Sequence, residues 1–121
     1  MNRGFSLVEL IVVLAVLAVL SSIASAKLRN MRDEAEAASC RTNLANLATA
    51  EQIYATHHGY INFAGSMSDL EPYITGGGGN GPVCPSGGEY ILDFDRRGGV
   101  QCTWTERQAH GSVSDGIKSW E

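Results

Sequence analysis

The chain begins with an apolar run in which the only formal charge between Phe5 and Ala26 is the carboxylate of Glu9. A helix needs roughly 20 apolar residues to cross a bilayer, so residues 5–26 are predicted to form a transmembrane helix. A carboxylate in such a run costs roughly 3 kcal/mol in lipid, and acids at membrane depth usually have a function. Glu9 is therefore a candidate site residue that needs a cationic partner.

A second pattern continues the helix beyond the apolar run. Lys27–His57 contains neither proline nor glycine and is rich in residues that favour helix. Apolar positions recur there at spacings of three and four, with one acid among them: Ala37, Cys40, Leu44, Leu47, Glu51 and Tyr54. This spacing predicts a buried stripe on one helix face. With Gly59 as the C-cap, the sequence predicts one helix from Ser6 to His58, with a membrane half and a soluble half.

The segment after the long helix contains a second, shorter helical pattern. Residues 66–74 predict a short helix with Ser66 and Ser68 as candidate N-caps. Three of its side chains are expected to pack on the long helix: Leu70, Tyr73 and Ile74. The glycine-rich residues 76–81 predict a flexible loop.

Two later runs, at residues 90–94 and 100–104, alternate apolar and polar side chains as half-buried strands do. Residues 95–99 connect them, so the pattern predicts a hairpin. One face would carry Tyr90, Leu92 and Phe94 opposite Val100, Cys102 and Trp104. Two strands alone are marginal, so a third short strand or the helix must complete the layer. The polar tail after Thr105 is predicted to have no regular structure. The fold class is α+β, with a long N-terminal helix packed on a small antiparallel sheet.

Composition and charge limit the possible functions. With 121 residues the chain has room for one domain, and its formal net charge is −4. Non-specific nucleic-acid binding requires a basic surface, so nucleic acid is not an expected partner. The sequence contains no HExxH motif, no phosphate-binding loop and no serine nucleophile motif, so neither an enzyme nor a cofactor is expected.

The N-terminal segment Arg3–Leu10 contains a basic leader residue, glycine, an aromatic residue, serine, two aliphatic residues and glutamate before the apolar run. It closely resembles the type III signal of type IV pilins and type II secretion pseudopilins. The resemblance implies that a prepilin peptidase cuts between Gly4 and Phe5 and methylates the new N-terminus at Phe5.

The resemblance also implies a domain organisation. Residues 1–4 would be a cleaved leader, residues 5–26 the transmembrane and filament-core helix, and residues 27–121 a periplasmic pilin-like domain. The positive-inside rule does not favour a cytoplasmic N-terminus, because basic residues follow the apolar run. The single-pass, N-terminus-inside orientation in the inner membrane is therefore implied by the resemblance alone.

The same resemblance suggests a partner for Glu9, namely the ammonium that cleavage creates at Phe5 of a neighbouring subunit. The expected function is a structural subunit of a pilus-like filament or a secretion pseudopilus, in the periplasm or at the cell surface. Its partners would be further copies of the chain, other pilins, the peptidase, the inner-membrane assembly platform and, before assembly, lipid. The alternatives are a membrane-tethered ligand- or ion-binding module and a minor pilin involved in DNA uptake.

The sequence contains three cysteines, Cys40, Cys84 and Cys102, and a disulfide between two of them could stabilise this small domain. Cys84 and Cys102 flank the predicted hairpin, and a disulfide between them could stabilise the fold by roughly 3 kcal/mol. Residues 84–90 resemble a Cys-Pro-x-Gly-Gly-x-Tyr pattern of short pilin-like proteins, and pilins often have such a C-terminal bridge. Cys40 would then act as a small apolar residue on the helix stripe. The alternative is that Cys40 itself forms the disulfide, with either Cys84 or Cys102.

The sequence also contains candidate ligands for two kinds of metal ion. Zinc would combine the cysteines with His57, His58 or His110, but no CxxC or HxxxH spacing is present, so no zinc site is predicted. Calcium could bind to acids near the C-terminus, as in major type II pseudopilins. The candidates are Asp93, Asp95 and Asp115, although their spacing is not that of an EF-hand.

Overall fold

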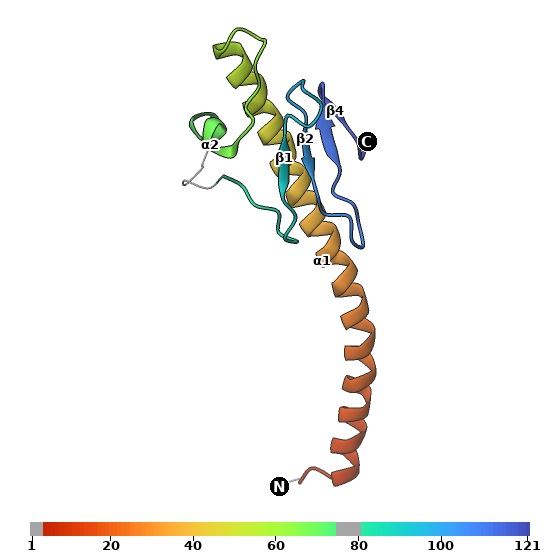
Figure 1. Ribbon diagram of the computed structural model, residues 1–121. Helices are drawn as coiled ribbons and strands as arrows, with labels where there is room; N and C mark the ends of the chain where they lie inside the picture. Colours follow the sequence, from red (N-terminus) through yellow and green to blue (C-terminus); the bar gives the residue numbers. More distant parts are fainter. Residues whose placement is uncertain (1–3, 75–80) are drawn as a thin grey trace. The chain divides into compact units, whose positions relative to one another are not determined.

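The computed structural model describes residues 4–74 and 81–121 and contains two compact units, which divide between Arg32 and Asp33. Helix α1 (Leu7–His57) is the first element and belongs to both units (Figure 1). Its bounds agree within one residue with the helix predicted from Ser6 to His58. The α+β class is confirmed, because a small antiparallel sheet follows this long N-terminal helix.

In the second unit, one face of α1 is buried along the predicted stripe. Its buried residues are Ala37, Cys40, Leu44, Leu47, Ala50, Glu51 and Ala55. The helix ends at the predicted cap, where Gly59 has a φ of 82° and the N–H of Tyr60 donates to the carbonyl of Ala55 at 2.8 Å. This left-handed glycine with a backward hydrogen bond is a common way to end a helix.

The predicted short helix is present as α2 (Met67–Leu70), followed by the 3₁₀ turn η1 (Glu71–Tyr73). Leu70 is fully buried, and the side chains of Tyr73 and Ile74 pack against the core. Ser66 occupies the N-cap position but makes no capping hydrogen bond. Its hydroxyl donates instead to the carboxylate of Asp69 at 2.7 Å. Most of the loop predicted at 76–81 lies outside the described residues.

Four short strands form one antiparallel sheet in the order β1-β2-β3-β4: β1 (Tyr90–Leu92), β2 (Val100–Cys102), β3 (Ser112–Ser114) and β4 (Ile117–Lys118). The predicted hairpin is confirmed, with Tyr90 opposite Cys102 and Leu92 opposite Val100. Phe94 and Trp104 lie beyond the strand ends. Backbone pairing continues past the strands, since the N–H of Thr103 donates to the carbonyl of Glu89 at 2.9 Å.

The prediction that the tail has no regular structure was wrong, because β3 and β4 form a second hairpin there. Asp115 and Gly116 make its two-residue turn, with φ values of 49° and 77°. Positive φ at both central positions is typical of the tight hairpin turn that Asp-Gly favours. The tail thus supplies the third strand that the sheet needed, and a fourth.

The inner face of the sheet packs against α1 within the second unit. Figure 1 shows the strands beside the second half of this helix. Val100 lies opposite Leu92 on one side and Val113 on the other, so these three side chains form an apolar row across the sheet. Val100 and Val113 are buried together with Leu44 and Leu47 of α1.

Candidate functional site

The first unit exposes an apolar helix surface. Every residue of α1 from Leu7 to Ala26 is exposed, and the most apolar stretch of the helix has a mean hydropathy of 2.7 with none of its residues buried. Phe5, just before the helix, is 83% exposed. Since the second half of the same helix buries one stripe against its own domain, the first half is the part that needs lipid or another protein to cover it.

Glu9 lies in the first turn of α1, on this exposed apolar segment. Gly4 and Phe5 precede the helix in extended or irregular backbone. The predicted cleavage point between Gly4 and Phe5 thus lies outside the helix. It also lies within a few residues of the acid that is predicted to pair with the new N-terminus.

A second group of candidate residues meets in the interior of the second unit. Cys40 from α1, Cys84 from the segment before β1, Cys102 from β2 and His110 from the loop before β3 are all buried. One ligand atom from each residue lies within 4.8 Å of the others. The Nδ1 atom of His110 is 3.2 Å from the sulfur of Cys84 and 3.7 Å from that of Cys102. We call these four residues the Cys/His cluster.

The three thiols are free in the structure, and their surroundings perturb them differently. Burial raises the pKa of Cys40 and of Cys102. Burial also acts to raise the pKa of Cys84, but the backbone N–H groups of Ser86 and Gly88, together with the other two thiols, lower it below its usual value. Cys84 is therefore the thiol of the cluster most easily deprotonated.

His110 completes the cluster as a neutral imidazole. Burial lowers its pKa, and the nearby guanidinium of Arg41 lowers it further, against a smaller opposite effect of Glu36. Its backbone N–H donates to the carbonyl of Trp104 at 3.3 Å. The other two histidines considered from the sequence, His57 and His58, lie at the exposed end of α1 and are not in the cluster.

The acids considered for calcium lie in two turns, and hydrogen bonds already occupy their carboxylates. Asp93 accepts from the N–H of Gly98 at 2.9 Å, and Asp95 accepts from the N–H of Gly99 at 2.8 Å. Asp115 forms an ion pair with Arg97 at 3.3 Å. Among residues 4–74 and 81–121, the group with metal-ligand geometry is the Cys/His cluster, and these acids are not part of it.

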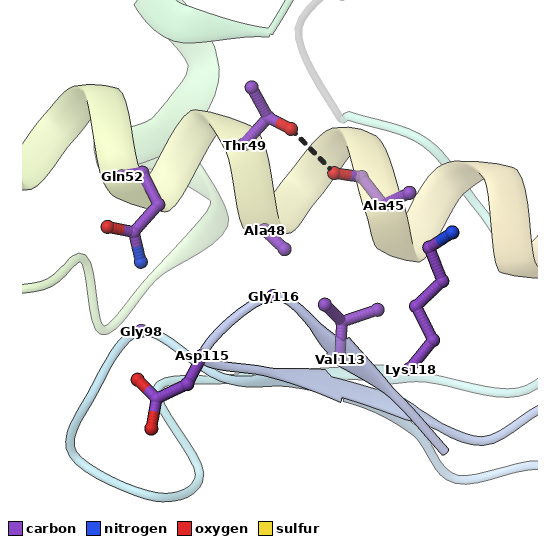
Figure 2. A pocket seen from close by; sticks show the side chains of 9 residues that line it. All are labelled: Ala45, Ala48, Thr49, Gln52, Gly98, Val113, Asp115, Gly116 and Lys118. Carbon is purple, nitrogen blue, oxygen red and sulfur yellow. Dashed lines mark hydrogen bonds between the residues drawn. The ribbon is translucent and has the colours of Figure 1, made fainter. Parts of the chain in front are cut away.

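An open pocket of about 510 Å³ lies between α1 and the β3–β4 hairpin (Figure 2). Its helix wall is made of Ala45, Ala48, Thr49 and Gln52, and Val113 and Gly116 lie opposite. The hydroxyl of Thr49 donates to the carbonyl of Ala45 at 2.9 Å, the dashed line in Figure 2. Gly98, Asp115 and Lys118 complete the lining, and the two charged side chains form ion pairs with Arg97 and Glu121.

Comparison with known families concerns the first of these sites. Residues 1–25 match the family model described as the prokaryotic N-terminal methylation motif. The chain carries the N-terminal signal of a type IV pilin-like prepilin. No curated protein and no solved structure matches it in the same comparisons.

The match has direct consequences for this prepilin. It is a pilin- or pseudopilin-type substrate of a prepilin peptidase, and its apolar N-terminal helix anchors it in a membrane. The motif points to a structural protein. The match ends at residue 25 and says nothing about the Cys/His cluster, which sequence spacing had also missed.

Proposed function

We propose that this prepilin is a structural subunit of a type IV pilus-like filament or a type II secretion pseudopilus. The peptidase cuts it after Gly4 and methylates the amino group of Phe5. The subunit waits in the inner membrane with its N-terminus in the cytoplasm and then joins other pilins in a filament. The observation that supports this most is the contrast along α1, in which residues 7–26 are apolar and exposed and the later half is already covered by its own domain.

The proposal assigns Glu9 the role of an ion-pair partner between neighbouring subunits. In lipid its carboxylate is unfavourable, and in a bundle of apolar helices it needs a positive partner. Cleavage produces that partner as the ammonium of Phe5, which Glu9 of an adjoining subunit can bind. A buried charge whose partner is removed costs several kcal/mol, so subunits packed in the wrong register are rejected.

The first test is the mature N-terminus, measured by mass spectrometry on native protein. We expect a chain that begins with N-methylated Phe5. An intact Met1, or cleavage after Ala26, would refute the proposal.

The second test separates a filament subunit from a membrane-tethered binding module. Glu9→Ala is expected to leave membrane insertion intact and to remove the subunit from sheared filaments. Glu34→Ala is the matched control, because Glu34 is an exposed acid further along the same helix. If Glu9→Ala assembles as well as Glu34→Ala does, the helix serves only as an anchor.

A further inference from the structure

The Cys/His cluster lies outside the methylation motif, and neither the motif nor the proposed filament function requires it. We propose that Cys40, Cys84, Cys102 and His110 bind a structural zinc ion. The proposal concerns the folding of the second unit and stands independently of filament assembly.

The distances in the cluster suit tetrahedral coordination. With Zn–S bonds of about 2.3 Å and Zn–N bonds of about 2.0 Å, neighbouring ligand atoms of a tetrahedral site lie about 3.5–3.8 Å apart. The observed separations from His110 Nδ1 are 3.2 Å to Cys84 and 3.7 Å to Cys102, and all four ligand atoms lie within 4.8 Å of one another. The widest of these separations exceeds the tetrahedral one by about 1 Å, so small side-chain movements would bring all four ligand atoms to an ion.

The donor set indicates which metal and which role. Three sulfurs and one imidazole nitrogen form a Cys₃His set, which is a standard combination for structural zinc and is too soft for calcium or magnesium. The exposed fraction is 6% for Cys84 and less for the other three residues. Four protein ligands in a buried site leave no place for a reactive water, so the ion would be structural.

The segment that carries Cys84 is shaped around its sulfur. The N–H of Gly87 donates to the carbonyl of Cys84 at 3.0 Å, which closes a turn through Pro85 and Ser86. This turn directs the N–H groups of Ser86 and Gly88 at the Cys84 sulfur. A Cβ atom on Gly88 would lie 2.8 Å from the sulfur of Cys102, so only glycine allows the segment to approach so closely.

Other polar groups support the remaining ligands, as is usual around metal sites. The hydroxyl of Tyr90 donates to the sulfur of Cys40 at 3.4 Å. Arg41 donates to the carbonyl of Ala109 at 3.3 Å and thereby holds the residue next to His110. Three thiolates around Zn²⁺ leave a net charge of −1, which the nearby guanidinium of Arg41 complements. The Cys-Pro-x-Gly-Gly-x-Tyr pattern and His110 thus all contribute to one centre.

The predicted disulfide between Cys84 and Cys102 is the competing use of the same atoms. It would employ two of the four ligands and give no role to the buried thiol of Cys40 or to the imidazole of His110. A zinc ion would employ all four and would join α1, the segment before β1, β2 and the loop before β3. Such a small core benefits from a link of this kind.

The first experiment measures metal and thiols in the full chain, purified in detergent with zinc and without chelator. We expect one zinc ion per chain, and three reactive thiols after denaturation in the presence of a chelator. Cobalt in place of zinc should give a thiolate-to-metal charge-transfer band and the intense visible bands of a tetrahedral site. One reactive thiol per chain and no bound metal would establish a disulfide and overturn the proposal.

The second experiment uses variants with a matched control. Cys40→Ser and His110→Ala should both lose zinc, whereas His110→Cys should keep it, and so should His57→Ala, which alters an exposed histidine outside the cluster. A disulfide between Cys84 and Cys102 would survive Cys40→Ser. Zinc content unchanged by Cys40→Ser or by His110→Ala would overturn the assignment.

If a variant fails to fold, removal of zinc from the unaltered chain provides the test. Its melting temperature should fall with chelator and recover with zinc, and no change would overturn the proposal.

Discussion

Glu51 is the one acid on the buried stripe of α1, and it makes the stability of the second unit depend on pH. Its side chain is fully buried. One carboxylate oxygen accepts the N–H of Ala64 at 2.8 Å, and the other has no hydrogen-bond partner among the described residues. Burial raises its pKa from the usual 4.5 to about 7, with smaller contributions from the nearby carboxylates of Asp93 and Asp69.

The sign of the effect follows from the protons that each state holds. Between pH 4.5 and 7 the folded chain keeps a proton on Glu51 that the unfolded chain has lost. The contribution of Glu51 to the free energy of unfolding therefore falls as the pH rises, and it is fully present only below pH 4.5. A difference of about 2.5 pKa units corresponds to about 3 kcal/mol, which is lost progressively across this range and levels off about one pH unit above 7.

Glu51→Gln should remove this dependence. The substitution keeps an oxygen for the N–H of Ala64 and has no proton to lose. Any difference in fit between the buried amide and the neutral acid changes the free energy of unfolding by the same amount at every pH. The quantity to compare is thus the change in unfolding free energy between pH 4.5 and 7.5, which should be about 3 kcal/mol smaller in the variant than in the unaltered chain.

The assay is urea unfolding of the full chain in a non-ionic detergent, followed by the fluorescence of Trp104 and Trp120, both of which lie in the second unit. Glu34→Gln is the control, because it removes an exposed acid from the same helix and should follow the unaltered chain. Parallel pH profiles for Glu51→Gln and the unaltered chain would refute the reasoning.

Two further predictions concern the turns of the sheet. Gly116→Ala should lower stability by about 1 kcal/mol in chemical unfolding, because φ is 77° there and space around it is open, whereas Gly65→Ala, which is equally open but not left-handed, should have little effect. Equal losses in the two variants would contradict this. Excess calcium should leave the melting temperature of the metal-loaded chain unchanged, because hydrogen bonds and an ion pair already occupy Asp93, Asp95 and Asp115. A rise that Asp95→Asn abolishes would restore the calcium hypothesis.

The elements that the sequence predicted well are those whose signal repeats along many residues. The spacing of Leu44, Leu47 and their neighbours marked the buried face of α1, and alternation marked β1 and β2. Around β1 and β2 the alternation continues past the strands to residues 94 and 104, whereas β3 and β4 contain three and two residues and are flanked by Gly111, Asp115 and Gly116, so no period shows there. The one strong signal of the β3–β4 hairpin was the dipeptide Asp115-Gly116, which favours a tight hairpin turn.

The two candidate sites also differed in how well the sequence predicted them. Gly4, Phe5 and Glu9 lie within six residues of one another in the sequence, so their motif can be read without any fold. The Cys/His cluster combines residues from four separate segments, and only the packing of the sheet against α1 brings them together. Cys40 and Glu51 were both visible on the helical stripe. The sequence could not show that one faces two other thiols and that the other meets the N–H of Ala64.

The position of the buried residues along α1 has a practical consequence for producing this protein. Every side chain that the structure shows as buried lies at or after Ala37, and Asp33, one turn earlier on the helix, forms an ion pair with Arg107 at 3.2 Å. A recombinant fragment that starts at Asp33 would keep the buried residues and this ion pair, and it would lack the exposed apolar segment of α1. It is the natural starting point for expression without detergent and for crystallisation.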